Sequence, residues 1–235
     1  MRSRAVVAVV MGRFVLLALA LHVAGCAPRV KRRVVYARPP VVQTDWPRPE
    51  VLDLAMRAWR CGLQEGEFSS SLLTVIDYSL PSTQPRLWVI DVPRHVLLHR
   101  ELVAHGEGSG DNYAVAFSNV PGSRQSSLGL FRTEGTYQGG SGYSLRLNGL
   151  EPGVNDMALE RNIVVHGADY VEPEMIAQYG RLGRSWGCPA LPREAARSVI
   201  EDIKGGSAVF AYYPDAQWLT YSHFLRCDGV GLAQR

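Results

Sequence analysis

The most informative pattern of strand and loop residues lies in the segment 161–191, which reads RNIVVHGADYVEPEMIAQYGRLGRSWGCPAL. Its β-branched run leads to His166 and then Gly167, and a glycine-rich loop later presents Cys188 in a shaped turn. Such a turn can project the sulfur and leave backbone N–H groups free to face a developing oxyanion. A histidine at a strand end can hold that sulfur as a thiolate, which lowers a pKa of about 8.5 in free cysteine. The segment therefore predicts a cysteine nucleophile with a histidine base, although a buried thiol and a core histidine would also explain these residue types.

Strand patterns surround this segment. Short β-branched and aromatic runs separated by turn residues occupy 71–78, 86–91, 95–104, 128–131, 143–147, 163–166 and 208–213. Apolar spacings of three and four predict helices over 51–63, 172–179 and 193–204. The glycine-rich stretches 106–110 and 139–142 match neither a phosphate loop nor a dinucleotide fingerprint and are expected to be hairpin loops. We therefore expect a mainly β fold with short helices (α+β).

Composition and charge exclude several classes of protein. The 235 residues are 46% hydrophobic and 20% charged, which excludes a disordered, collagen-like or polytopic membrane chain. Residues 1–25, 26–50 and 51–235 carry net charges of +3, +4 and −4, which together give the +3 of the chain. Because the large C-terminal part is acidic, we expect no nucleic acid as a partner.

The N-terminal residues resemble an export signal. Arginines precede an apolar run over 14–21, and small residues at 23–25 lead directly to Cys26. This order resembles the bacterial lipobox, in which cleavage before the cysteine is coupled to lipidation of its thiol. An ordinary signal peptide or an uncleaved anchor helix is the alternative. We expect a signal peptide over 1–25, lipid on Cys26, a Pro/Arg-rich tether over 26–50 and a catalytic domain over 51–235.

The central motif resembles a known family. VVHG (164–167) followed by SWGC (185–188) is similar to the His-Gly … Ser-x-Gly-Cys signature of the L,D-transpeptidase catalytic domain. The subfamily most similar is that of the murein L,D-transpeptidases, whose motif ends in Gly-Cys-Pro-Ala. Further similar stretches are 102–106, 117–119, 126–131, 142–147 and 155–156, so the resemblance covers roughly 70–213. It implies a β-sandwich-like sheet assembly with the cysteine on a loop.

The resemblance also implies a reaction. Members of the family cleave the amide between diaminopimelate and the terminal D-alanine of a peptidoglycan tetrapeptide stem, and then join the acyl group to a second stem as a 3→3 crosslink. By this resemblance Cys188 is the nucleophile and His166 the general base and acid. The carbonyl of Gly167 would orient the imidazole, backbone N–H groups near Gly187 and Cys188 would form the oxyanion hole, and Ser185 would support the loop. No cofactor is implied.

Two departures from the broader family concern substrate binding. Trp186 stands where a histidine is usual, and Pro189-Ala190 replaces a pair that includes arginine. The missing arginine would have bound a substrate carboxylate. Arg146, Arg181 or Arg184 could replace it, and Trp186 would line the same region.

Other functions remain open from the sequence. The same acyl-enzyme resolved by water would make an L,D-carboxypeptidase or L,D-endopeptidase, and a silent lipoprotein would only bind peptidoglycan. The expected partners are peptidoglycan stem peptides and, through Cys26, a membrane, with the protein acting as a monomer. We expect a periplasm-facing location in the cell envelope, and the absence of aspartate at Ala27 favours the outer membrane.

Further expectations concern the remaining cysteines and histidines. An oxidising envelope would let Cys61 and Cys227 pair, although they could also be two unrelated thiols. His95 and His99 are four positions apart but lie in a strand-like run, so no metal site is expected. His105 could line the cleft.

Overall fold

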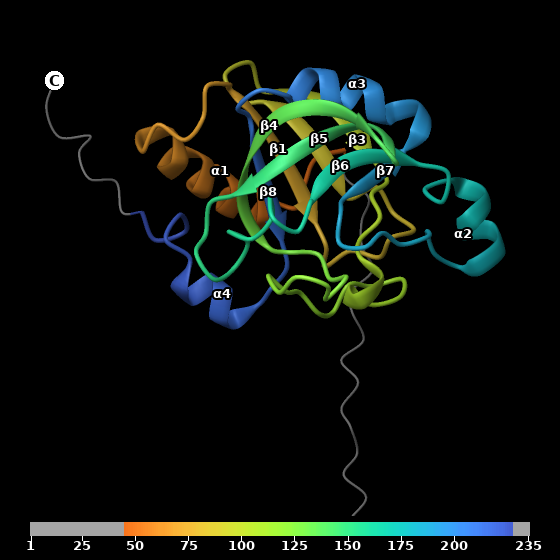
Figure 1. Ribbon diagram of the computed structural model, residues 1–235. Coiled ribbons are helices and arrows are strands. Elements are labelled where there is room, and N and C mark those ends of the chain that lie inside the picture. Colours follow the sequence, from red (N-terminus) through yellow and green to blue (C-terminus); the bar gives the residue numbers. More distant parts are fainter. Residues whose placement is uncertain (1–44, 228–235) are drawn as a thin grey trace, which may run out of the picture. The chain divides into compact units, whose positions relative to one another are not determined.

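The computed structural model describes residues 45–227, which form an eight-stranded sheet and four α-helices (Figure 1). The strands follow the order β3-β2-β1-β8-β4-β5-β6-β7 across the sheet. They are β1 (Leu72–Asp77), β2 (Leu87–Asp91), β3 (Val96–Glu101), β4 (Gly129–Gly139), β5 (Gly142–Gly149), β6 (Val164–Ala168), β7 (Ala190–Pro192) and β8 (Ala208–Tyr212). The helices are α1 (Pro49–Gln64), α2 (Pro173–Tyr179), α3 (Arg193–Ile203) and α4 (Ala216–Tyr221), with a 3-10 helix η1 (Glu107–Ser109). The expectation of a mainly β fold with short helices is confirmed.

Two parallel strand pairs bring distant segments of the chain together. β1 pairs with β8 in parallel, and β6 pairs with β7 in parallel, whereas the other neighbours are antiparallel. A parallel pair needs a crossover connection, and residues 169–189, including α2, provide it between β6 and β7. The 185–188 loop therefore returns to the strand that carries His166.

Helices α1 and α3 cover the buried surface of the sheet. The helix α1 buries Val51, Ala55, Ala58 and Trp59, and it contacts β1 and β8. The helix α3 buries a stripe of four residues and contacts β5, β6 and β7. Burial on both faces explains why β1, β2 and β8 contain almost continuous apolar residues and not an alternating pattern.

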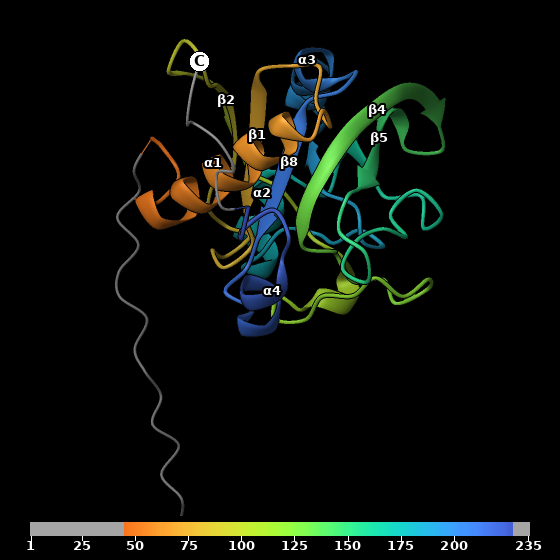
Figure 2. The same ribbon diagram turned by 90° about the vertical axis from the view of Figure 1, so that its left-hand side faces the viewer.

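Several elements differ from the sequence expectation. The strand β4 extends eight residues past the apolar run at 128–131, and Figure 2 shows it as a long curved strand. Its distal half is polar and half-exposed, which removed the usual strand signal, and its pairing with β5 shifts between Thr133 and Thr136. The three-residue strand β7 and the six-residue helix α4 are too short for a periodic pattern. Residues 139–142 do form the expected hairpin turn.

The folded part begins before the predicted end of the tether. The indole N–H of Trp88 donates to the carbonyl of Asp45 at 3.1 Å, and Arg48 binds the buried carboxylate of Asp77 at 2.9 Å. Pro49 lies in the first turn of α1, where a missing N–H costs nothing. Residues 45–50 thus belong to the folded part. The signal peptide, Cys26 and the rest of the tether lie outside the described residues. Within residues 45–227 no helix is long and apolar enough to span a membrane.

A disulfide joins the two ends of the described chain. Cys61 of α1 is bonded to Cys227, with a Cα–Cα distance of 5.7 Å across a sequence separation of 166 residues. Cys188 is the free cysteine among the described residues. The bond ties the first helix to the segment that follows α4.

Candidate active site

The parallel pairing of β6 with β7 positions Cys188 next to the strand of His166. The register aligns His166 with Ala190, so Cys188, two residues earlier, lies level with Val164. The backbone N–H of Val164 accordingly lies 3.4 Å from the sulfur of Cys188. The thiol also lies 3.6 Å from the carbonyl oxygen of Asn162, to which it can donate. His166 therefore lies in β6, and Cys188 lies in the bend that leads into the neighbouring strand β7.

The contacts of His166 determine which of its nitrogens carries the proton. The side chain is buried, and its Nδ1 lies 3.0 Å from the carbonyl oxygen of Gly167. A carbonyl oxygen can only accept, so Nδ1 must donate and Nε2 of the neutral ring is left with a lone pair. Burial lowers the pKa of His166 below its ordinary value, the charge of Arg193 acts in the same direction, and the Gly167 contact opposes them. The imidazole is thus ready to accept a proton near neutral pH.

The electrostatics of Cys188 differ from the sequence expectation. Burial raises the pKa of its thiol, although the Val164 N–H and the charge of Arg161 act in the opposite direction. From the sequence we expected the histidine to lower this pKa and to hold a resting thiolate. In the structure the surroundings of each group favour its neutral form, a thiol at Cys188 and an imidazole at His166. The thiolate would then form when the thiol proton is transferred during the attack.

The loop that carries the cysteine is held by serine side chains. Ser185 Oγ donates to the carbonyl of Cys188 at 2.6 Å and accepts from the N–H of Gly187 at 3.1 Å. Ser126 Oγ donates to the carbonyl of Gly187 and accepts from the N–H of Gly106, both at 3.0 Å. The expected support of the loop by Ser185 corresponds to these contacts, and Ser126 is a residue that the sequence analysis did not single out. The N–H of Gly187 is engaged by Ser185, which leaves the N–H of Cys188 as the better oxyanion donor.

Gly187 is required by its backbone and by its neighbours. Its φ of +125° lies in a region that side chains disfavour, and a Cβ would lie 2.9 Å from the carbonyl oxygen of Gln125. The glycine before the cysteine therefore allows the tight approach of two loops.

Arg161 binds the segment 118–127, which packs against Gly187 of the cysteine loop, and it was not singled out from the sequence. Its guanidinium donates to the carbonyl of Ser118 and the hydroxyl of Ser127 at 2.6 Å, and to the carbonyl of Gln125 at 2.5 Å. Its charge is also close enough to Cys188 to lower the pKa of that thiol. No local pattern separates this arginine from the other basic residues, because its acceptors come from a segment more than 30 positions away.

The three candidate carboxylate-binding arginines have different surroundings. Arg184 donates to the carbonyl of Gly110 and pairs with Asp111 at 2.9 Å, and Arg181 lies 3.6 Å from the same carboxylate. Arg146 on β5 is opposite Val164 in the sheet register, and its guanidinium stacks on the ring of Tyr137 at 4.1 Å. Arg146 is thus paired with the residue whose N–H contacts the sulfur of Cys188, whereas the other two arginines share Asp111.

Trp186 lies on the surface of the protein, whereas His105 lies in its interior. Trp186 is 71% exposed, and the guanidinium of Arg124 stacks on its ring at 4.8 Å. His105 is fully buried and does not line a cleft, which corrects the sequence expectation. Its Nδ1 accepts from the buried guanidinium of Arg86 at 2.7 Å, and burial together with that charge lowers the pKa of His105 to about 3. The carbonyl of His105 accepts from the N–H of Ser185 at 3.0 Å. The buried Arg86–His105 pair therefore also holds the loop that carries Cys188.

Comparison with solved structures finds partial likenesses. An L,D-transpeptidase from Mycobacterium smegmatis is 14% identical, with 61% of this chain and 59% of that chain covered and a TM-score of 0.37. L,D-transpeptidase 3 from Mycobacterium tuberculosis is 15% identical, with 61% of each chain covered and a TM-score of 0.38. An L,D-transpeptidase from Stackebrandtia nassauensis is 16% identical, with 69% and 65% covered and a TM-score of 0.38. This chain thus spans about three fifths of the length of these structures. No curated protein matches it.

A family model gives the more extensive match. It is described as an L,D-transpeptidase catalytic domain, and it covers residues 44–212, which include every strand and the His166 and Cys188 motifs. The chain belongs to the L,D-transpeptidase catalytic domain family.

Proposed function

We propose that this protein is a cysteine-dependent peptidoglycan L,D-transpeptidase of the murein subfamily. Membership of the family supports a peptidoglycan L,D-transpeptidase-type function. The observation that supports the cysteine mechanism is the contact of the Cys188 sulfur with Val164 of β6, the strand that carries His166, together with the Nδ1–Gly167 contact that leaves Nε2 of the neutral imidazole as the acceptor. A protein that only bound peptidoglycan would have no use for this arrangement.

The first half-reaction uses the neutral pair. His166 Nε2 accepts the proton of the Cys188 thiol while the sulfur attacks the carbonyl of diaminopimelate in the tetrapeptide stem. The N–H of Cys188 donates to the oxyanion that forms. The imidazolium returns its proton to the amine of D-alanine as that group leaves, and a thioester to Cys188 remains.

The second half-reaction transfers the acyl group. The side-chain amine of a diaminopimelate in another stem attacks the thioester, His166 accepts a proton from that amine, and the thiol is regenerated with a 3→3 crosslink. Water in place of the amine would give a tripeptide, which is the outcome of an L,D-carboxypeptidase. Arg146 is our candidate for binding the stem carboxylate because it pairs with Val164, whose N–H contacts the sulfur of Cys188.

The test uses purified protein and disaccharide-tetrapeptide muropeptides. Mass spectrometry should detect crosslinked dimers with loss of one D-alanine. Tripeptide monomers without dimers would assign the hydrolytic alternative, and unchanged substrate would assign the binding role.

We further propose that the protein is anchored in the cell envelope through lipid on Cys26, with the outer membrane favoured. The basis is the sequence at 14–27, which lies outside the described residues. Cys26→Ala should leave the protein unprocessed or mislocalised on membrane fractionation. A soluble, trimmed protein from the unaltered gene would contradict the anchor.

A further inference from the structure

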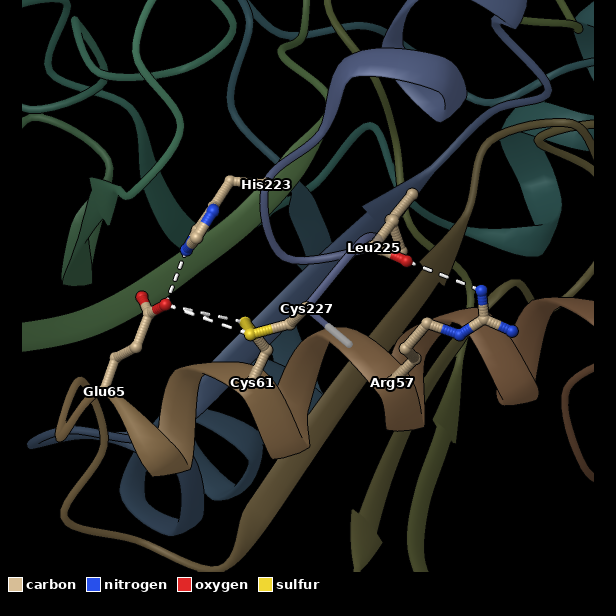
Figure 3. Close-up of a disulfide and its surroundings, with 6 residues drawn as sticks. All are labelled: Arg57, Cys61, Glu65, His223, Leu225 and Cys227. Carbon is tan, nitrogen blue, oxygen red and sulfur yellow. Dashed lines mark hydrogen bonds and ion pairs between the residues drawn. A yellow bond between two sulfur atoms is a disulfide. The ribbon is translucent and has the colours of Figure 1, made fainter. Parts of the chain in front are cut away.

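A corner of the molecule outside the proposed active site gathers four groups that can bind a metal. Cys61 and Glu65 come from the end of α1, and His223 and Cys227 come from the turn after α4 (Figure 3). The four ligand atoms all lie within 4.8 Å of one another.

The carboxylate of Glu65 is central to this cluster. Its Oε1 lies 2.5 Å from Nε2 of His223, 3.7 Å from the sulfur of Cys61 and 3.9 Å from the sulfur of Cys227. The disulfide alone needs neither the imidazole nor the carboxylate. An exposed His–carboxylate contact also contributes little to stability. The convergence of both groups on the two sulfurs is therefore not explained by the bond that the structure contains.

The chain positions these residues in pairs. Cys61 and Glu65 are four residues apart, so α1 presents them on one face. His223 and Cys227 are also four apart, and Arg57 of α1 donates to the carbonyl of Leu225 between them at 3.4 Å (Figure 3). This contact holds the turn against α1 independently of the disulfide.

The two redox states of the sulfurs offer different chemistry. A disulfide supplies no thiolate, and the thiolate is the form that binds metals. Two thiolates, one imidazole and one carboxylate are a four-ligand set of the kind that tetrahedral zinc prefers, and the thiolates disfavour magnesium and calcium. Around such a zinc ion the ligand atoms are separated by roughly 3–4 Å. The distances of 3.7 and 3.9 Å from Glu65 to the two sulfurs lie in this range, and the sulfurs would move apart once their bond is reduced.

We propose that reduction of the Cys61–Cys227 bond converts this corner into a zinc site formed by Cys61, Glu65, His223 and Cys227. A dithiol reductant supplies two electrons and two protons, becomes a disulfide itself, and leaves two thiols. One Zn²⁺ then replaces the two thiol protons, which pass to solvent, and takes the imidazole nitrogen and the carboxylate oxygen as its other ligands. In the reduced form zinc would thus join α1 to the C-terminal turn, as the disulfide does in the oxidised form.

The experiment uses the full chain with Cys26→Ser and Cys188→Ser, so that Cys61 and Cys227 are the remaining cysteines. The oxidised and the phosphine-reduced forms are titrated with Zn²⁺ by calorimetry and with Co²⁺ by absorption. We expect one ion to bind per reduced chain with the Co²⁺ spectrum of a tetrahedral thiolate site, and no comparable binding to the oxidised chain. His223→Ala and Glu65→Gln should each weaken the zinc affinity of the reduced form by more than about tenfold.

His99→Ala is the matched control, because His99 pairs with Asp202 at 2.6 Å in a His–carboxylate contact that lacks cysteines. It should leave zinc binding unchanged. Equal binding by the two redox forms would overturn the proposal, as would unchanged affinity in both His223→Ala and Glu65→Gln. If reduction destabilises the fold, the melting temperature of the reduced chain provides a second measurement. Zinc should raise this melting temperature, because it binds the folded form. A reduced chain that zinc neither stabilises nor refolds would also overturn the site.

Discussion

The backbone N–H of Val164 lies 3.4 Å from the sulfur of Cys188, so the strand that carries His166 also contacts the candidate nucleophile. One parallel ladder consequently sets the distance between the two groups. Displacing β7 would move the sulfur relative to the imidazole even if both side chains were intact, which makes the loop contacts of Ser185 and Ser126 part of the catalytic geometry.

Replacement of the two central residues should separate chemistry from folding. Cys188→Ser should form no acyl-enzyme, because the pKa of its hydroxyl is out of reach of an imidazole. His166→Ala should slow turnover by about 10²- to 10⁴-fold and retain slow stoichiometric acylation. Both should melt close to the parent protein. The measurement is adduct formation with a carbapenem by intact-mass spectrometry, and conversion of tetrapeptides by Cys188→Ser at the parent rate would refute the mechanism.

The ionisation of Cys188 should follow the direction set by its burial. Because burial raises the pKa of the thiol, its thiolate should form at a higher pH than that of a free cysteine. Because burial lowers the pKa of His166, the base should stay neutral, and kcat/KM should stay high, to a lower pH than for an exposed histidine. Thiolate absorbance measured against a Cys188→Ser blank checks the first statement. A full thiolate signal at pH 7 would instead indicate a resting thiolate–imidazolium pair.

Arg161 should affect both stability and reactivity. Arg161→Ala leaves loop carbonyls without their donor, and we expect the free energy of unfolding to fall by about 1–3 kcal/mol. The pKa of Cys188 should rise further, since this charge now lowers it. Arg161→Lys should keep more of the pKa effect than of the stability, because it retains the charge but loses the planar fork of donors.

The matched control for Arg161 is Arg197→Ala. Arg197 stacks on the ring of Tyr143 at 4.7 Å, outside the loop contacts of Arg161. It should change the free energy of unfolding by less than about 0.5 kcal/mol and leave acylation unaltered. Equal effects of the two substitutions would show that Arg161 has no particular role at the loop.

Trp186 should act on substrate binding and not on the fold. Because its side chain is 71% exposed, Trp186→Ala should shift the free energy of unfolding by less than about 0.5 kcal/mol. If the ring lines the substrate path, KM for muropeptides should rise while acylation by a small carbapenem changes less. Trp186→His should be tolerated better than Cys188→Ser or His166→Ala. Unaltered KM in Trp186→Ala would remove Trp186 from the substrate site.

In the oxidised protein the disulfide should affect stability and not catalysis. Cys61→Ser or Cys227→Ser opens a closed loop of 166 residues, and chain entropy predicts a loss of up to about 5 kcal/mol in the free energy of unfolding. Chemical denaturation of oxidised parent and variant measures the loss. Acylation of Cys188 in the folded variants should be largely intact, and its disappearance would mean that the clamp also positions the site.

The elements with a strong local pattern could be predicted from the sequence. Helices α1 and α3 follow from apolar stripes at spacings of three and four, and the buried strands β1, β2 and β8 from β-branched runs. A strand-end histidine and a cysteine in a glycine-rich turn could also be singled out as candidates, because each residue type has a distinct chemical use. These are properties of short segments of the chain.

Which of these segments contact one another depends on the tertiary structure. The strand β7 is three residues long and exists because β6 offers it a parallel edge. Arg161 finds its acceptors, and Glu65 meets His223, across 36 and 158 positions of sequence, so no local spacing could indicate either contact. The pKa of Cys188 rises instead of falling because burial, which depends on the whole fold, outweighs its nearest favourable contacts. Ladder partners, burial and clusters of ligands depend on packing between distant segments, whereas local periodicity depends on neighbours along the chain.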